Sequence, residues 1–427
     1  MWSTLKIISC QGEDQIVYLD IPSDRDSVYM RIAKFCLTIS GLWKGPEDRT
    51  LNKPVVAGIV GFLCLGLLGT LHQLLFIPQD IYKGTEALMH ITLLGYSLST
   101  YIILIWKQKT ILKMLTLVET NFNDFGKTYI KHNKHQIVAE KNNAVLVITI
   151  SVIIFSVHSS FIGVSKVYRV HLPPENKSLL FPMTVPLELT NIAYYAVYVL
   201  QLMITVCEGY IHITGITLCA GFINILCAQF AALGRAFRLL APLARHRALH
   251  CSAREVVLGW RSDDHVDHHA QDLLKSFVDH HNTLLQFYKD LQSTFGIPIL
   301  DLFVNSQIML CSTGFHIFKL YQAGALEQLF KQLCMFAALI SHEFVYFWFG
   351  SHLNAEVSSF RNDVYACEWT ERSARFKRSY RIILERIKRG VTIQAVILPT
   401  NLATFAKCLK AAFSYFNLLL ALSYKQD

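Results

Sequence analysis

Charged residues are scarce in this chain, and that scarcity excludes a soluble protein of its size. Asp, Glu, Lys and Arg make up 17% of the 427 residues, whereas a typical soluble protein has about 25%. Apolar residues make up 52%, and the mean hydropathy is +0.34. The apolar residues also lie in long blocks, which is typical of membrane-spanning helices. The sequence therefore predicts an all-α, polytopic membrane protein.

Motifs of several other classes of protein are missing. The sequence contains no GxSxG, HExxH, P-loop or GxGxxG motif in a plausible context, so we predict neither an enzyme nor a cofactor site. It has no RNA-binding or zinc-finger pattern, so its net charge of +9 does not indicate a nucleic-acid partner. No two of its 11 cysteines form a CxxC pair. The Asp- and His-rich run Asp263–His269 matches no known metal-ligand spacing, and we interpret it as a solvated loop without a metal.

Seven segments are long and apolar enough to cross a membrane, at about 20 residues each. The fourth is ambiguous, because apolar sequence continues from Ile192 to Phe230, which is roughly 58 Å of helix. It could form two spans with a turn at Glu208–Gly209 or one long helix that projects beyond the membrane. The expected spans are Pro54–Ile77, Gly84–Trp106, Asn143–Ser165, a segment that begins near Thr190, Phe295–Leu320, Leu329–Gly350 and Leu402–Leu422.

The distribution of basic residues decides between these alternatives, because cytoplasmic loops collect Lys and Arg. With seven spans and a cytoplasmic N-terminus, the inner segments hold 31 of the 40 Lys and Arg residues and the outer segments hold six. Two spans in the fourth segment would move the most basic later loops outside. We therefore expect one long helix, a cytoplasmic N-terminus and an extracellular C-terminus, which argues against a G-protein-coupled receptor. The sequon at Asn176 then lies outside, where it could be glycosylated.

The cytoplasmic segments are expected to be helical too. An apolar stripe that starts at Leu273 leads into the fifth span, and a basic helix follows the sixth span. That helix could lie on the inner leaflet, but we favour packing against other helices and other subunits. Residues 390–400 look strand-like, and Asn401 or Thr400 can cap the final helix. The apolar face of the basic helix comprises Phe376, Tyr380, Ile383 and Ile387.

This topology divides the chain into four parts. Residues 1–53 form a cytoplasmic N-terminal segment, and residues 54–350 form the first six spans with a ligand pocket in their outer half. Residues 351–400 form a cytoplasmic anchor segment, and residues 401–427 form the last span and a short extracellular tail. Lys407 and Lys410 in that span are expected to face water, which indicates a pore.

Ionisable side chains inside spans are costly and are often functional. Glu208 and His212 lie four residues apart in the fourth span, and His342 and Glu343 lie in the sixth. Either pair could instead hold helices together. Aromatic and mildly polar side chains also crowd the outer halves of several spans, and such a set suits a small organic ligand, although each member alone could serve ordinary helix packing. The candidate ligand-binding residues are Leu88, His90, Ile91, Leu94, His158, Phe161, Tyr194, Tyr195, Tyr198, Gln201, Phe330 and Phe336.

The last eighty residues resemble the insect odorant receptor family. The resemblance rests on Phe347–Gly350, Val364–Trp369, Leu398-Pro399, Thr404–Lys410 and Phe413–Phe416, in that order and spacing. Lys407 departs from the family pattern, where a small or aliphatic residue is usual. The related gustatory receptors end in a Gln-Phe pair that this chain lacks, and the odorant co-receptor has a longer inner loop between spans four and five. The chain is therefore similar to an odorant-tuning subunit.

The resemblance implies a ligand-gated, non-selective cation channel that binds small volatile organic molecules. It implies a tetramer with the odorant receptor co-receptor, in the plasma membrane of olfactory sensory neuron dendrites. The final helix would surround the pore, with Leu418 and Leu422 as a hydrophobic gate, and the cytoplasmic helices would join the subunits. Two alternatives stay open: a gustatory receptor subunit, which would assemble without the co-receptor, and a seven-span receptor that signals through G proteins.

Overall fold

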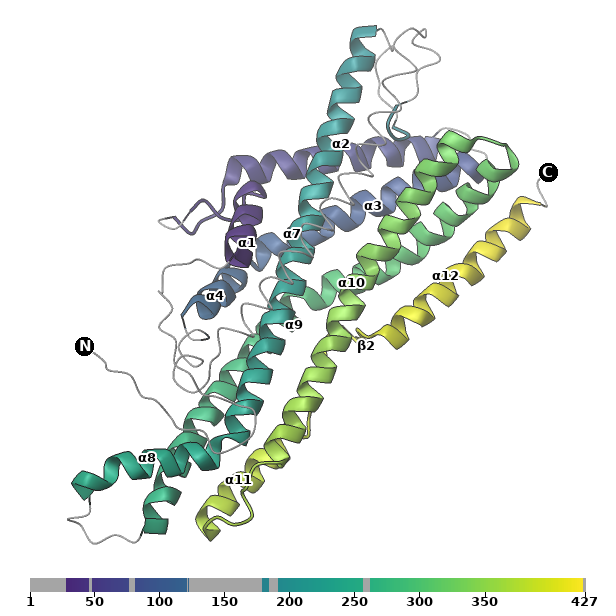
Figure 1. The fold of residues 1–427 in the computed structure, drawn as a ribbon. Helices are drawn as coiled ribbons and strands as arrows, with labels where there is room; N and C mark the ends of the chain where they lie inside the picture. The colour runs from purple at the N-terminus through teal and green to yellow at the C-terminus, as the bar shows by residue number, and fades with distance from the viewer. Residues whose placement is uncertain are drawn as a thin grey trace.

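The structure is a computed structural model that describes residues 28–45, 48–76, 81–120, 122, 179–183, 191–255 and 262–424. These residues are mostly helical, and long helices run side by side as a bundle of rods (Figure 1). The helices are α1 (Val28–Ile39), α2 (Lys53–Phe76), α3 (Ile81–Trp106), α4 (Gln108–Glu119), α7 (Asn191–Arg238), α8 (Leu240–Glu255), α9 (Ser262–Gln322), α10 (Leu326–Tyr365), α11 (Ala374–Ile387) and α12 (Leu402–Ser423). A short hairpin of β1 (Gln394–Ala395) and β2 (Leu398–Pro399) lies between α11 and α12.

Six helices in the described part of the chain are long and apolar enough to cross a membrane: α2, α3, α7, α9, α10 and α12. Each corresponds to one of the spans expected from sequence. The remaining expected span, at residues 143–165, lies outside the described residues. The predicted class, a helical polytopic membrane protein, is confirmed; the orientation of the helices in the membrane stays a prediction.

The ambiguous fourth segment is one helix. α7 runs without interruption for 48 residues, about 72 Å at the standard rise, so it extends far beyond a hydrocarbon core of about 30 Å. α9 is longer still, with 61 residues and Pro298 inside it. Its first half is the helical stripe predicted from Leu273, and its second half is the fifth span. Both helices are therefore longer than a span needs, and they run on into a second helical region (Figure 1).

That second region, at the end of the molecule where α8 and α11 lie, has a dense aromatic core. Phe237 of α7 is 1% exposed, and its ring lies 5.2 Å from that of Phe277 on α9 and 6.0 Å from that of Phe360 on α10. Tyr380 of α11 is fully buried 6.2 Å from the Phe237 ring. An ion pair between Arg238 and Asp363 also joins α7 to α10. Four helices thus meet around one apolar centre.

Local signals explain how the chain enters α11 and α12. The Ser373 hydroxyl accepts a hydrogen bond from the Phe376 backbone N–H at 3.3 Å and caps α11. The Asn401 side chain accepts one from the Thr404 N–H at 2.9 Å and caps α12, so Asn401 is the cap of the two candidates. The hairpin between these helices is held against α9, because the Gln394 backbone N–H donates to the Gln292 side-chain oxygen at 2.9 Å; just before β1, the Tyr288 hydroxyl donates to the Thr392 carbonyl at 2.8 Å.

The junction between α10 and α12 needs a glycine. Gly350 lies so close to the strand-to-helix connection that a Cβ there would overlap the Thr400 carbonyl oxygen. The backbone of α10 therefore touches the backbone that leads into α12. Because two main chains meet, neither can move aside as a flexible side chain could.

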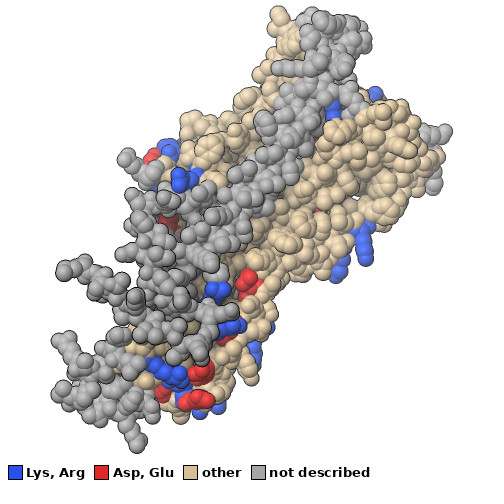
Figure 2. Space-filling view, viewed as in Figure 1, with Lys and Arg blue, Asp and Glu red and all other residues tan. Residues whose placement is uncertain are grey.

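Charge is unevenly spread over the surface. In Figure 2 one large group of Lys, Arg, Asp and Glu lies at the end of the molecule near α11 and a smaller group lies near the connection between α1 and α2, whereas the face over the opposite ends of α9 and α10 carries few of them. Such a surface fits a protein with one end in water and a belt of apolar side chains in lipid.

Candidate functional site

Four ring side chains from three helices form a cluster inside the membrane region. The members of this His–Tyr cluster are Tyr96 on α3, His212 on α7, and His342 and Tyr346 on α10. The His212 and His342 rings stack with centroids 5.3 Å apart. The Tyr96 ring meets them edge-on at 5.1 and 6.2 Å, and Tyr346 lies 5.7 Å from His342. His342 and Tyr346 both enter the cluster because residues four apart on α10 lie on the same face of the helix.

Hydrogen bonding in this cluster is incomplete. The Ser97 hydroxyl on α3 forms a 2.9 Å hydrogen bond with Nε2 of His212. In contrast, Nε2 of His342 is buried, and none of the described residues offers it a hydrogen-bond partner. A buried polar atom without a partner costs free energy. A ligand with a polar group at this position would supply the hydrogen bond that Nε2 of His342 lacks.

A group of methionines lies about two helical turns from this cluster, because Met89 precedes Tyr96 and Met335 precedes His342 by seven residues each. Met89 on α3, Met309 on α9 and Met335 on α10 are buried together, with Leu93 and Leu339 packed against them. The Thr313 hydroxyl of α9 lies 3.2 Å from Sδ of Met89. Because Met is unbranched and polarizable, a wall of methionines can adapt to ligands of different shape. We call Met89, Met309 and Met335 the Met cluster.

Two of the sequence-predicted ligand residues hold a neighbouring segment in place. The Gln201 side chain is fully buried; its amide donates to the Phe181 carbonyl at 2.9 Å and accepts from the Leu180 N–H at 2.8 Å. His90 stacks on the Phe181 ring with centroids 5.3 Å apart. Gln201 thus has a structural task that its position in the sequence did not reveal.

The other predicted ligand residues are not gathered into one cluster. On α7, the Tyr194 ring lies 5.4 Å from that of Tyr195 and 6.1 Å from that of Tyr198. Leu94 is buried and Ile91 and Phe336 are half-buried. The exposed members are Leu88 at 36%, Tyr195 at 48% and Phe330 at 63%. His158 and Phe161, like the sequon residue Asn176, lie outside the described residues.

Sequence reasoning missed most of the residues that the structure does gather. Tyr96, Tyr346 and the three methionines come from separate helices, and nothing in the local pattern around them sets them apart. His212 and His342 were identified as ionisable groups within spans but not as neighbours. Glu343 is fully buried; its Oε1 accepts a 3.0 Å hydrogen bond from the Ser306 hydroxyl on α9, and its Oε2 has no hydrogen-bond partner among the described residues.

The final helix rests on the bundle by a narrow strip. Phe405 packs at 5.6 and 5.4 Å against Phe344 and Phe347 of α10, and Phe416 lies over Gly314 of α9. The predicted gate residues Leu418 and Leu422 are 59% and 49% exposed. Lys407 and Lys410 are exposed as well.

The predicted anchor face is packed within the subunit. Phe376 and Tyr380 are fully buried and Ile387 nearly so, while Ile383 is half-buried against the same core. The Tyr380 hydroxyl donates to the Val364 carbonyl of α10 at 2.6 Å. This apolar face therefore covers its own α7 and α10, and its role between subunits stays a prediction.

The His- and Asp-rich run places His268, His269 and Asp272 within 4.8 Å of one another at the start of α9. His268 and Asp272 are exposed, and the latter pairs with the former at 3.4 Å. The run is helical rather than the loop expected from its composition, because α9 begins at Ser262. The closeness of these side chains follows from their spacing of one helical turn and is not by itself evidence of a metal site.

A comparison with protein families decides the identity of the chain. The family model described as 7tm Odorant receptor matches residues 84–413, a range that runs from the first turn of α3 to the middle of α12. The chain belongs to the seven-transmembrane odorant receptor family. This receptor is therefore a member of the family that its last eighty residues resemble.

Individual relatives are distant. Odorant receptor 22c of Drosophila melanogaster is 28% identical over 146 residues, which cover 34% of this chain and 36% of that receptor. Odorant receptor 85b of the same fly is 21% identical over 409 residues, which cover 91% of this chain and 97% of that one. Among solved structures, the olfactory receptor OR5 of Machilis hrabei in complex with eugenol matches with a TM-score of 0.71 at 12% identity, over 92% of this chain and 98% of that one. The fold is therefore shared over nearly the whole length.

Proposed function

We propose that the receptor is the odorant-tuning subunit of a ligand-gated, non-selective cation channel that assembles with the odorant receptor co-receptor in olfactory sensory neurons. A small volatile organic molecule binds between α3, α7, α9 and α10. The observation that carries this proposal is the pairing of the Met cluster with the His–Tyr cluster. It combines adaptable apolar walls with a few hydrogen-bonding groups, which is the composition of small-molecule sites in proteins.

The unpartnered Nε2 of His342 defines the kind of ligand that binds best. A ligand that carries one hydroxyl or carbonyl oxygen can bond to this nitrogen while its hydrocarbon part contacts Met89, Met309 and Met335. A pure hydrocarbon fills the same space without that bond. The receptor should therefore respond to oxygenated volatiles at lower concentration than to hydrocarbons of the same size.

The same helices that hold the ligand carry the final helix. Met309 lies on α9, and Met335 and His342 lie on α10, while α12 contacts the rest of the subunit through these two helices. A ligand that separates α9 from α10 slightly would shift the position of α12 and of Leu418 and Leu422. The ligand can open the channel only by its greater affinity for the open arrangement.

The test is the odour-evoked current of cells that express the receptor with and without the co-receptor, with surface expression measured in parallel. We expect currents only with the co-receptor. A broad panel of volatiles that evokes no current, despite good surface expression, would count against the channel. A current that does not need the co-receptor would support a gustatory-type assembly instead.

A pair of histidine variants tests the ligand site. His342→Ala should raise the half-maximal concentration of oxygenated ligands by up to about tenfold, the value of one hydrogen bond, and should change the response to hydrocarbons far less. His72→Ala on the exposed face of α2 is the matched control and should change neither. Equal losses for both classes of ligand would refute the hydrogen-bonding role of His342.

The proposed orientation has its own test. An epitope tag after Asp427 should be reached by antibody on intact cells that express the receptor. A tag that becomes accessible only after the cells are permeabilised would place the C-terminus inside and would favour a G-protein-coupled receptor.

A further inference from the structure

A cavity of about 800 Å³ opens where α2 begins and α3 ends. The segment that precedes α2 forms one wall and α4 forms the other. Its volume is within the range of roughly 300–1,000 Å³ that small-molecule sites occupy. Several threonine hydroxyl groups line the cavity, together with four basic side chains. The basic residues are Arg49, Lys53, Lys109 and Lys113.

Positive charge is in excess in this cavity. Lys113 pairs with Asp290 of α9 at 2.8 Å and is still 60% exposed. Arg49 donates a hydrogen bond to the Thr116 hydroxyl at 3.2 Å, which holds its guanidinium over the cavity wall. The described ranges contain no ion pair for Arg49, Lys53 or Lys109. The cavity therefore presents at least three cations that an anion could neutralise.

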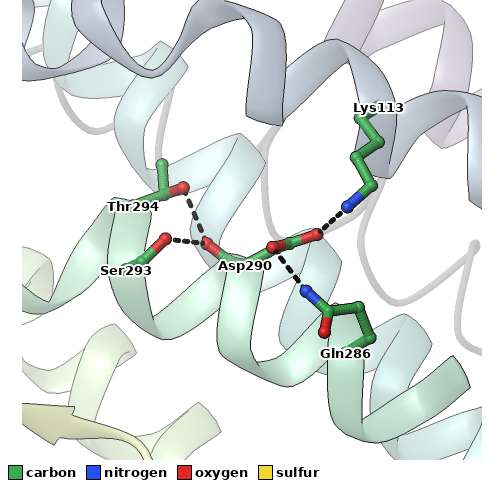
Figure 3. Close-up of polar contacts among 5 residues, drawn as sticks. All are labelled: Lys113, Gln286, Asp290, Ser293 and Thr294. Carbon is green, nitrogen blue, oxygen red and sulfur yellow. Dashed lines mark hydrogen bonds and ion pairs between the residues drawn. The ribbon is translucent and has the colours of Figure 1, made fainter. Parts of the chain in front are cut away.

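Asp290 would compete with a bound anion for the ammonium group of Lys113. Figure 3 shows its carboxylate between the Lys113 ammonium and the Gln286 amide, which bond to it at 2.8 and 3.0 Å. The Ser293 and Thr294 hydroxyls bond instead to its backbone carbonyl. A smaller cavity of about 360 Å³ lies on this side and shares Lys113 with the larger one. Lys113 can thus turn toward Asp290 or toward an anion in the larger cavity.

The cavity lies at the level of a membrane surface. Lys53 is the first residue of the apolar helix α2, and Trp106 is the last residue of α3. Trp106 is 80% exposed, and the Lys107 ammonium lies 5.8 Å from its ring. An exposed Trp next to Lys at the end of a spanning helix is typical of the headgroup region. In the orientation of the proposed function, this is the cytoplasmic leaflet, where anionic lipids collect.

We propose that this cavity binds an anion with clustered phosphate groups, of the kind carried by a polyphosphoinositide headgroup or by a soluble inositol phosphate. Arg49, Lys53 and Lys109 bind the phosphates, and Lys113 joins them when it leaves Asp290. The bound anion therefore weakens the tie between α4 and α9, the helix that also carries Met309. This step rests on the proposed function for its cytoplasmic placement and for its effect on the channel.

The binding experiment uses the purified full-length receptor in lipid nanodiscs. The membranes contain phosphatidylcholine alone, phosphatidylcholine with phosphatidylserine, or phosphatidylcholine with phosphatidylinositol bisphosphate at matched total charge; inositol trisphosphate is the soluble probe. We expect retention of the bisphosphate lipid over phosphatidylserine. Tighter binding of inositol trisphosphate than of the bisphosphate lipid would identify the soluble anion as the ligand and would still support the site. Equal retention of the two anionic lipids would overturn it.

Charge variants locate the site. The double variant Lys53→Gln/Lys109→Gln should weaken phosphate binding by about 25-fold, at roughly fivefold for each cation near the headgroups. Lys53→Arg/Lys109→Arg should retain it. The control Lys275→Gln/Lys289→Gln removes the same charge from exposed positions on α9 that do not line the cavity. An equal loss in the control would show diffuse attraction and no site. All variants are compared by elution in size-exclusion chromatography.

Asp290→Asn changes binding in the opposite direction. Without the carboxylate, Lys113 is released to the cavity, so affinity for the bisphosphate lipid should rise about threefold to fivefold. A fall in affinity would contradict the competition between Asp290 and the anion.

Currents from inside-out patches separate this inference from the proposed function. Removal of the bisphosphate lipid by a phosphatase should reduce the odour-evoked current of the wild type, and the Lys53→Gln/Lys109→Gln variant should start from that reduced level. A robust current that ignores the lipid overturns the regulatory site and leaves the channel intact. Lipid binding without any odour-evoked current retains the site and overturns the channel.

Discussion

Helices α7 and α12 are both apolar enough to span a membrane, yet they relate to the rest of the subunit in opposite ways. In the most apolar stretch of α7, 94% of the residues are buried inside the subunit, whereas in α12 only 6% are. α7 passes through the middle of the bundle, and α12 lies along its edge (Figure 1). Apolar side chains of similar composition are therefore buried inside the chain in α7 but lie on its surface in α12.

This difference separates the part that stabilises the subunit from the part that can move. Burial of large side chains is the main favourable contribution to folding, and it is concentrated around α7, α9, α10 and α11. The free energy of α12 depends largely on what surrounds the chain, because little of this helix is covered by its own chain. A helix with few contacts inside its own chain can shift at small cost, and the proposed pore-lining role of α12 requires such a shift.

The largest expected effect comes from truncating matched phenylalanines in the two helices. Phe237→Ala on α7 should reduce the free energy of unfolding of the detergent-solubilised receptor by about 3–5 kcal/mol, because it leaves a cavity between Phe277 and Phe360. Phe413 on α12 is 63% exposed, so Phe413→Ala should change it by less than about 0.5 kcal/mol. Thermal unfolding followed by intrinsic fluorescence measures both. Similar losses would show that α12 is as much a part of the subunit core as α7.

The second effect lies where the two regions join. Gly350→Ala should destabilise the receptor by about 3 kcal/mol, the upper part of the range for overpacking, because the new methyl group overlaps the Thr400 carbonyl. Helix propensity alone predicts the opposite, a gain of about 1 kcal/mol. Surface expression and thermal stability report the change. Gly61→Ala on α2, where a Cβ meets nothing within 4 Å, is the control and should be neutral or slightly stabilising.

The helices could be predicted closely because their signals are local. The first span was expected at Pro54–Ile77 and α2 is Lys53–Phe76; the last was expected at Leu402–Leu422 and α12 is Leu402–Ser423. Apolar length defines such segments, the Asn401 cap defines a start, and the distribution of basic loops distinguished one long α7 from two helices. None of these signals requires knowledge of a neighbouring helix.

The site could not be predicted in the same way, because it depends on how the helices are rotated against one another. Met89, Met309 and Met335 are more than two hundred residues apart at the extremes, and only the packing of three helices unites them. Gln201 has the right character for a ligand contact, but residues 180 and 181 occupy its amide. Sequence indicates which side chains are suitable, and tertiary structure decides which are available.

A third effect is a loss of stability in acid that originates in the core around α7. Burial, with a smaller contribution from nearby Arg386, lowers the pKa of His281 from 6.5 to about 4; its ring stacks on Phe360 at 5.6 Å. Between pH 6.5 and pH 4, His281 is protonated in the unfolded chain but stays neutral in the folded chain. Stability is therefore complete above pH 6.5 and falls as the pH drops toward 4, by about 1.4 kcal/mol for each pH unit.

The measurement compares wild type with His281→Phe, which keeps an aromatic ring against Phe360. Between pH 7.5 and pH 5, the wild type should lose about 2 kcal/mol more than the variant does. Identical pH profiles would mean that His281 accepts its proton in the folded receptor as easily as in the unfolded one.

The smallest effect is the loss of one buried hydrogen bond on the core side of the comparison. The Tyr380 hydroxyl donates to the Val364 carbonyl at 2.6 Å, and the ring is fully buried between Trp369 and Phe376. Tyr380→Phe keeps the ring and removes only the donor, so it should cost about 1 kcal/mol. Tyr365→Phe, with a ring that is 70% exposed, makes the same chemical change at the surface and should cost almost nothing. A loss of about 1 kcal/mol in Tyr380→Phe alone would mean that the α11 face stabilises its own chain without help from another subunit. No difference between the two variants would mean that α11 contributes as little to the stability of its own chain as α12 does.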